Sequence, residues 1–259
     1  MTARLSKTML TTVATHRLIE ESDRILVAIS GGKDSATLLD LLLRARRKAP
    51  VRFELVAFHL DQGQPGYDGT PLRPWLESLD VPFEIAREDT YSAVIADAER
   101  QEGATFCRLC SRLRRGILYA AAERLHCNKV ALGHHRDDAL ETLLLNLFYS
   151  GKLQAMPAAY TTNDGRFRVI RPLIGCAERD IAAHAAAARY PILPCNLCGS
   201  QLDLKRVRVK RLLAELEREH PDLRPVMLAA LHNVRPTHLL DHEVAEAWIA
   251  RAGERPPRR

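Results

Sequence analysis

Residues 27–39 are Val27-Ala28-Ile29-Ser30-Gly31-Gly32-Lys33-Asp34-Ser35-Ala36-Thr37-Leu38-Leu39, and they join an apolar run to two glycines and a leucine-rich segment. The apolar run 25–29 predicts a buried strand, and the leucines that follow, to about residue 47, predict a helix. A strand, a glycine turn and a helix start this close together aim backbone N–H groups and the positive end of a helix at one point. The stretch therefore predicts a phosphate-binding loop rather than a simple tight turn.

The side chains of this loop suit a phosphate and a metal ion. Gly31 and Gly32 allow unusual backbone angles and leave room for a close ligand. Lys33 can add positive charge and Asp34 is placed to hold a metal ion, while Ser30 and Ser35 can donate hydroxyls. The spacing fits neither the Walker pattern nor the dinucleotide fingerprint.

Length and composition bound the class of protein. The 259 residues, 46% of them hydrophobic, can build one large domain or a domain with an appendage. A net charge of +6 permits a polyanionic partner such as nucleic acid. No apolar run approaches the roughly 20 residues of a membrane span, so we expect no membrane contact and a cytoplasmic location. The first residues predict an amphipathic helix that packs on the domain rather than a transit peptide.

Beyond the loop, strands alternate with helices, which predicts a parallel sheet covered on both faces. Ligands collect at the carboxyl ends of such strands. Ser30, His59 and Gly133 each follow a predicted strand, so we expect them to converge on one nucleotide. Further strands are expected at 53–60, 81–86, 129–132 and 169–173. Further helices are expected at 74–79, 91–100 and 179–189. Two more are expected, one that ends near residue 125 and one that begins after residue 134.

A second polar cluster, Gly133-His134-His135-Arg136-Asp137-Asp138, stands at a strand end where a helix begins. Asp137 and Asp138 either complement the helix dipole or serve catalysis or Mg²⁺. One of the two histidines is expected in the core and the other beside the nucleotide. The apolar residues of the following helix are expected to face inward: Leu140, Leu143, Leu144 and Leu147.

Six cysteines are present, and four of them form two Cys-x-x-Cys pairs, Cys107 with Cys110 and Cys195 with Cys198. Their spacing leaves a zinc site, a redox dithiol and an iron–sulfur cluster open. Cys127 and Cys176 are isolated, and we expect both to be buried. Basic residues follow each pair and either form a solvated face or bind a phosphate backbone: Arg112, Arg114, Arg115, Lys205, Arg206, Arg208, Lys210 and Arg211. The tail 255–259 is expected to be disordered.

The loop sequence Ser-Gly-Gly-Lys-Asp-Ser resembles the PP-loop of ATP pyrophosphatases, which split ATP into AMP and pyrophosphate. Together with Cys-x-x-Cys-Ser-Arg-Leu-Arg-Arg-Gly, Gly-His-His-Arg-Asp-Asp and Pro-Cys-Asn-Leu-Cys-Gly-Ser-Gln, it resembles the tRNA 2-thiocytidine synthetase family from about residue 18 to 201. The resemblance implies an α/β fold with a Rossmann-like parallel sheet of the PP-loop type. We accordingly expect an N-terminal helix over 1–20, a PP-loop domain with an iron–sulfur site over 21–200 and a basic helical appendage over 201–259.

The family resemblance also implies an activity, the ATP-dependent thiolation of cytidine 32 in the tRNA anticodon loop to 2-thiocytidine. The C2 oxygen would be adenylated, and cluster-bound sulfide would displace AMP. The implied cofactors are ATP, Mg²⁺ and a 4Fe–4S cluster held by Cys107, Cys110 and Cys198, with Cys195 as the alternative third ligand. The implied partners are tRNA and a sulfur donor such as a cysteine desulfurase, and a homodimer is compatible with the sequence.

From the motifs and the resemblance we assign roles to individual residues. The catalytic set is Asp34, Asp138, Asp137 and Arg114. The nucleotide-binding set is Ser30, Gly31, Gly32, Lys33, Asp34, Ser35, His59, Gly133 and His134. The rival functions are another PP-loop modification of tRNA, such as uridine thiolation or lysidine synthesis, and a non-catalytic iron–sulfur or zinc RNA-binding or redox-sensing protein. Lysidine synthesis leaves the cysteines without a role, and a non-catalytic protein leaves the glycine loop without one.

Overall fold

The computed structural model describes residues 2–100, 106–193 and 204–252. The chain divides into two compact units, Met1–Leu213 and Ala214–Arg259. The predicted domain boundary at residues 200 and 201 stays a prediction, and the tail 255–259 lies outside the described residues. No helix in the described part of the chain is both long and apolar enough to cross a bilayer.

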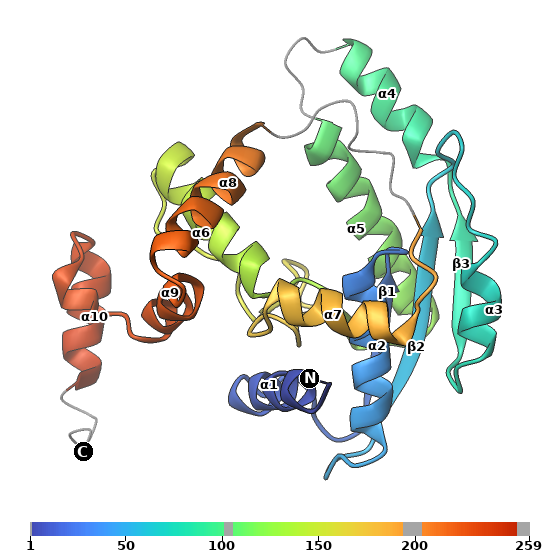
Figure 1. The fold of residues 1–259 in the computed structure, drawn as a ribbon, viewed down its shortest axis with the longest axis horizontal. Coiled ribbons are helices and arrows are strands. Elements are labelled where there is room, and N and C mark those ends of the chain that lie inside the picture. The colour runs from blue at the N-terminus through green and yellow to red at the C-terminus, as the bar shows by residue number, and fades with distance from the viewer. Residues whose placement is uncertain (1, 101–105, 194–203, 253–259) are drawn as a thin grey trace. The chain divides into compact units, whose positions relative to one another are not determined.

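The first unit is built on a six-stranded sheet with the order β3-β2-β1-β4-β6-β5 (Figure 1). All neighbouring strands pair in parallel except β5, which is antiparallel to β6. This confirms the predicted α/β fold, whereas the short edge strand β5 was not expected. The strands are β1 Asp23–Ile29, β2 Phe53–Asp61, β3 Phe83–Arg87, β4 Lys129–Ala131, β5 Ala159–Thr161 and β6 Arg168–Ile170.

Both faces of the sheet are covered, because side chains alternate between the two faces along each strand. Ile25, Val27 and Ile29 of β1 belong to a core with residues of α1, α2, α3 and α7. Leu26, between them, packs in a second core with residues of α5. In Figure 1, α2 and α7 run side by side. The helices of this unit are α1 Thr2–Thr15, α2 Lys33–Arg46, α3 Leu72–Glu77, α4 Thr90–Arg100, α5 Phe106–Arg124, α6 Arg136–Tyr149, α7 Glu178–Ala188 and the larger part of α8 Leu204–Glu219.

The strand order places the site. β1 lies between β2 and β4, and the chain moves to opposite sides of β1 to form these two strands. The carboxyl ends of β1 and β4 therefore flank a topological switch point, where open α/β sheets bind ligands.

Helix α6 departs from one expectation. Leu140 is fully buried, but Leu147 is 47% exposed, so the prediction that Leu147 faces inward is wrong. Burial decreases along the helix because only its first turns, up to Glu141, are covered by the rest of the unit, and the remainder extends away (Figure 1).

The second unit is helical in its described residues. It holds the end of α8, then α9 Leu223–His232, a short 3₁₀ helix Pro236–His238 and α10 His242–Ala252. The buried Arg224 donates its Nε–H to Glu217 Oε2 at 2.8 Å, which joins α9 to the end of α8 within this unit.

A buried ammonium group joins the starts of two central strands. Lys129 Nζ, on β4, donates to Asp23 Oδ2 and to Glu20 Oε2, each at 2.7 Å, and to the carbonyl oxygen of Leu18 at 3.2 Å. The side chains of Lys129 and Asp23 are each only 4% exposed. Removing one partner of such a pair leaves the other charge buried without compensation.

We expect Lys129→Met to lower the free energy of unfolding by about 3–5 kcal/mol, because Asp23 then stays buried without its cation. Denaturant unfolding of the purified protein measures the loss. Arg52→Met is the control, because the Arg52–Glu21 pair is exposed and is worth under about 1 kcal/mol. Equal losses in the two variants would contradict the role of Lys129.

Candidate active site

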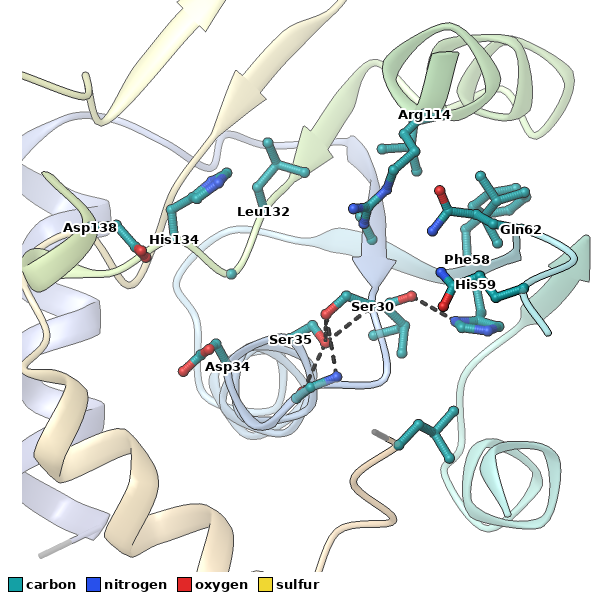
Figure 2. A pocket seen from close by; sticks show the side chains of 18 of the residues that line it. Ser30, Asp34, Ser35, Phe58, His59, Gln62, Arg114, Leu132, His134 and Asp138 are labelled. Atoms are coloured by element: carbon teal, nitrogen blue, oxygen red, sulfur yellow. Dashed lines mark hydrogen bonds between the residues drawn. The ribbon is translucent and has the colours of Figure 1, made fainter. Parts of the chain in front are cut away.

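A cavity of about 440 Å³ opens at the carboxyl ends of β1, β2 and β4 (Figure 2). Figure 2 shows Asp34, His134 and Asp138 on one side and His59 and Gln62 on the other. Arg114 extends from α5 toward the space between them. The predicted site residues in its wall are Ser30, Gly32, Asp34, Ser35, His59, Arg114, Gly133, His134 and Asp138.

The loop that opens α2 is held by its own serines. The backbone N–H of Ser30 donates to Ser35 Oγ at 3.0 Å, and this hydroxyl donates to the carbonyl oxygen of Gly32 at 3.0 Å. Gly31 has φ +83°, a conformation that disfavours a side chain. Gly32 is the N-cap of α2, and no described side chain caps the helix there. The first N–H groups of α2 are thus available to an anion.

The turn after β4 meets this loop backbone to backbone. A Cβ on Gly133 would lie 3.0 Å from the carbonyl carbon of Asp34 and 3.0 Å from the nitrogen of Ser35. Only glycine fits such an approach without a shift of the backbone. The two motifs that the sequence placed 100 residues apart therefore share one wall.

Lys33 and Gly31 lie outside the wall of the cavity. Lys33 Nζ is 3.1 Å from Glu178 Oε1, at the start of α7, and donates to Asp34 Oδ2 at 3.2 Å. Burial opposes ionisation of Glu178, but the hydrogen bond and charge of Lys33, with help from Lys210, outweigh it and lower the pKa of Glu178 to about 2. Glu178 is therefore an anion that holds the loop lysine.

Asp34 and Asp137, two acids near the loop, are placed differently. Asp34 lines the cavity, and its Oδ1 is buried with no hydrogen-bond donor among the described residues, although Lys33 Nζ lies 3.1 Å away in an ion pair. Asp137 is buried outside the wall, and its Oδ2 accepts the backbone N–H of Glu178 at 2.8 Å. This contact fixes the start of α7 and favours a structural role for Asp137. Its catalytic role stays a prediction.

Asp138 both caps α6 and faces the cavity. Its Oδ2 accepts the backbone N–H of His135 at 3.0 Å, and the backbone N–H of Asp138 donates to His135 Nδ1 at 3.4 Å. This reciprocal pair is a capping box. His135 is 5% exposed at the N-cap, so His134 is the histidine that lines the cavity.

His134 is held as a neutral hydrogen-bond donor. Arg171 Nε–H donates to His134 Nδ1 at 3.3 Å, and since a guanidinium has no acceptor, the ring proton is on Nε2. Burial, the charge of Arg171 and further positive charge nearby lower the pKa of His134 to about 4. Arg171 itself is buried, and its guanidinium lies over the Tyr160 ring, 5.2 Å from the centroid.

His59 is fixed through both ring nitrogens. Its Nδ1 donates to the carbonyl oxygen of Ile29 at 2.8 Å, and its Nε2 accepts the Tyr67 hydroxyl at 2.5 Å. Burial lowers the pKa of His59, which keeps the ring neutral. His59 therefore forms the wall through its ring rather than through a nitrogen without a partner.

Each cysteine pair is represented at the cavity by one described residue. These are Cys110 of the first pair and Leu193, two residues before the second pair. Cys110 Sγ is 3.5 Å from Oε1 of Gln62, which lines the cavity. Leu193 also lines it, and its backbone N–H donates to the carbonyl oxygen of Gly31 at 2.9 Å. The Cys107 side chain, Cys195 and Cys198 lie outside the described residues. Among the residues that are described, no three His, Cys, Asp or Glu side chains are arranged to hold a metal.

Cys127 and Cys176 are buried, at 4% and 1% exposure, which confirms the prediction for both. Burial raises the pKa of the Cys176 thiol to about 12. The two sulfurs are therefore packing groups.

Several residues of the site were not predicted. Gln62, Tyr67, Leu193 and Arg206 line the cavity, and Glu178 and Arg171 support it from behind. Arg171 directly follows β6, so its position after a strand was a usable signal. Gln62 directly follows β2 and gave the same signal, and Arg206 belongs to the basic run that the sequence indicated for a phosphate backbone rather than for the cavity. Tyr67, Leu193 and Glu178 lie where local sequence patterns do not indicate a site.

Comparison with known proteins identifies relatives over most of the chain. A family model described as PP-loop domain matches residues 2–198. The tRNA-cytidine(32) 2-sulfurtransferase of Anaeromyxobacter dehalogenans (strain 2CP-C) is 54% identical over 92% of this chain and 82% of the relative. The protein of the same name from Aeromonas hydrophila is 48% identical over 93% of this chain and 79% of the relative.

Among solved structures, the U34-tRNA thiolase NcsA from Methanococcus maripaludis, with its [4Fe-4S] cluster, has a similar fold. The TM-score is 0.69 at 21% sequence identity, and the match covers 90% of this chain and 80% of that chain. This comparison supports the fold, in agreement with the observed strand order.

We expect Arg171→Met to raise the pKa of His134, because the variant removes a nearby positive charge and the donor to Nδ1. An NMR titration of protein with ¹⁵N-labelled histidine measures the pKa and the tautomer. Arg166→Met is the control, since Arg166 is exposed and pairs with Glu123 and Asp164. An unchanged pKa and tautomer in Arg171→Met would refute the contact.

Proposed function

The chain belongs to the tRNA-cytidine(32) 2-sulfurtransferase family of PP-loop proteins, and from this membership we propose that it thiolates cytidine 32 of tRNA to 2-thiocytidine at the expense of ATP. ATP would be split into AMP and pyrophosphate. The observation that carries the proposal is the convergence of three features on one cavity: the loop of β1 and α2, the acidic turn after β4, and the described ends of both cysteine segments.

ATP phosphates would bind at the start of α2. The uncapped N–H groups of this helix and the hydroxyl of Ser30 supply hydrogen bonds, and Arg114 supplies positive charge from the opposite wall. Lys33 would add to them after exchanging Glu178 for a phosphate. His134 would donate a hydrogen bond from Nε2–H to a phosphate oxygen. The ring would stay neutral near neutral pH, because its pKa is about 4.

The residues fit a bound Mg²⁺. Asp34 Oδ1 is a buried carboxylate oxygen without a hydrogen-bond donor among the described residues, and the Asp138 carboxylate lines the same cavity. Hard divalent cations prefer such oxygen ligands. Asp34 would hold the ion directly, with Asp138 assisting, and the ion would offset phosphate charge in the transition state.

The reaction has two steps. The C2 oxygen of cytidine first attacks the α-phosphorus of ATP, and pyrophosphate leaves. A sulfur nucleophile then attacks C2, the bond from C2 to oxygen breaks, and AMP leaves with that oxygen. Arg114, in the cavity wall, would stabilise negative charge on the phosphates in the first step and on the departing AMP in the second.

An iron–sulfur cluster is compatible with the position of Cys110 beside the cavity. Cys110 would be one ligand, with Cys107 and Cys198 as the others and Cys195 as the alternative to Cys198. Cys110 Sγ lies 3.5 Å from Oε1 of Gln62, which lines the cavity, and this contact supports a sulfur site close to the base. When bound, a 4Fe–4S cluster with three cysteine ligands would supply the sulfur for transfer.

Nucleoside mass spectrometry of bulk tRNA tests the function. We expect tRNA from cells lacking this protein to lose 2-thiocytidine, and the wild-type chain to restore it. Asp34→Asn should not restore it and should reduce AMP release in vitro by at least about 100-fold, because the phosphate charge loses its counter-ion. Asp80→Asn, an exposed acid, is the matched control. Loss of a thiolated uridine instead would identify the rival thiolase activity.

The cluster assignment has its own test. We expect Cys110→Ala, purified without oxygen, to lose the iron content and visible absorption of a 4Fe–4S protein and to stop forming 2-thiocytidine, while ATP binding persists. Cys127→Ala should keep all three properties, since this sulfur is buried in the second core. A wild-type protein that holds zinc and no iron would reject the cluster.

A further inference from the structure

The exposed end of α6 has no role in the chemistry described above. Leu147, Phe148 and Tyr149 are 47%, 52% and 42% exposed at the last turn of this helix. The Phe148 and Tyr149 rings meet edge to face, 6.5 Å apart and at 87°. The next residues, 150–154, are all exposed as well. We call Phe148 and Tyr149 the aromatic pair.

The aromatic pair lies next to the basic face of α8. Lys205 Nζ is 4.9 Å from the centroid of the Tyr149 ring, a cation–π contact. The following residue, Arg206, lines the cavity. Lys205 and Arg206 are neighbours in α8, and their Cα atoms are about 3.8 Å apart. The same turn of α8 therefore contacts both the aromatic pair and the wall of the cavity.

The two segments that hold the aromatic pair and Lys205 carry charge of one sign. Residues 142–163 and 204–214 contain no Asp or Glu. The same two segments carry Lys152, Lys205, Arg206, Arg208, Lys210 and Arg211. Of these, Lys210 pairs with Glu178. Exposed aromatic rings beside a basic helix face match single-stranded nucleic acid, whose bases stack and whose phosphates are anionic.

We propose that the aromatic pair is a stacking platform for an unpaired nucleotide of the RNA substrate, beside the base that enters the cavity. This inference rests on the proposed function and adds a second contact point to it. Extracting a single base from a loop unstacks its neighbours, and a ring outside the cavity compensates one of them. Base-to-ring stacking makes a contribution that corresponds to about 5- to 150-fold in affinity.

The test is binding of an unmodified anticodon stem-loop RNA to the full-length protein at several salt concentrations. We expect Phe148→Ala to raise Kd at least about 5-fold with an unchanged salt slope, because stacking releases no counter-ions. Lys205→Ala should instead lower the slope by about one. Phe148→Trp should retain the wild-type affinity, since it keeps an aromatic face.

Leu10→Ala is the matched control, because Leu10 is also 47% exposed but lies on α1. An unchanged Kd for Phe148→Ala would overturn the platform, and so would a change in the sedimentation of the RNA-free protein, which would identify the pair as a contact between copies of the chain. If the wild-type protein forms 2-thiocytidine while Phe148→Ala binds normally, the platform fails and the proposed function stands. A wild-type protein that does not bind the stem-loop would overturn both.

Discussion

The site depends on a contact in which two turns meet without side chains between them. Gly133, after β4, lies against the peptide that joins Asp34 to Ser35 at the start of α2. This approach brings the acidic turn of α6 to the same wall as the uncapped N-terminus of α2. A Cβ at residue 133 would lie 3.0 Å from this peptide and would push the two turns apart. The distance between the start of α2 and the acidic turn after β4 is thus fixed by a contact of main-chain atoms. The polar side chains do not set this distance.

Charge in this region is organised by burial as well as by sequence. Asp34 presents a buried carboxylate oxygen that no described group satisfies with a hydrogen bond, which is costly in a folded protein and typical of a ligand site. Asp137 uses its carboxylate to start α7, and Glu178 holds Lys33. His134 and His59 are kept neutral by burial. The cavity therefore combines the carboxylates of Asp34 and Asp138 with the neutral donor His134 and the guanidinium of Arg114, a balance that suits a triphosphate and a divalent cation together.

The parts of the fold and site that were predictable come from local patterns. The glycine loop and the turn after β4 each lie within a dozen residues, and strands alternate with helices along the chain, so these patterns predicted a parallel sheet and its binding edge. The three-residue strand β5 was too short to produce a pattern. The outward position of Leu147 was not predictable either, because helical spacing does not say where a helix leaves the sheet. Glu178, Leu193 and Arg171 act on partners 37 to 162 residues away, and such pairings follow only from the tertiary structure.

The hydrogen bond from Leu193 to Gly31 also joins the glycine loop to the chain that leads to the second cysteine pair. It joins main-chain atoms, so replacement of the Leu193 side chain leaves both partners of the bond in place. A Cβ on Gly31 would instead lie 3.0 Å from Cβ of Leu193 and disturb the contact. Cys195 is two residues beyond Leu193 and Cys198 is five residues beyond it. A shift of the Gly31 backbone would therefore also move the Leu193 backbone, two residues before the second cysteine pair.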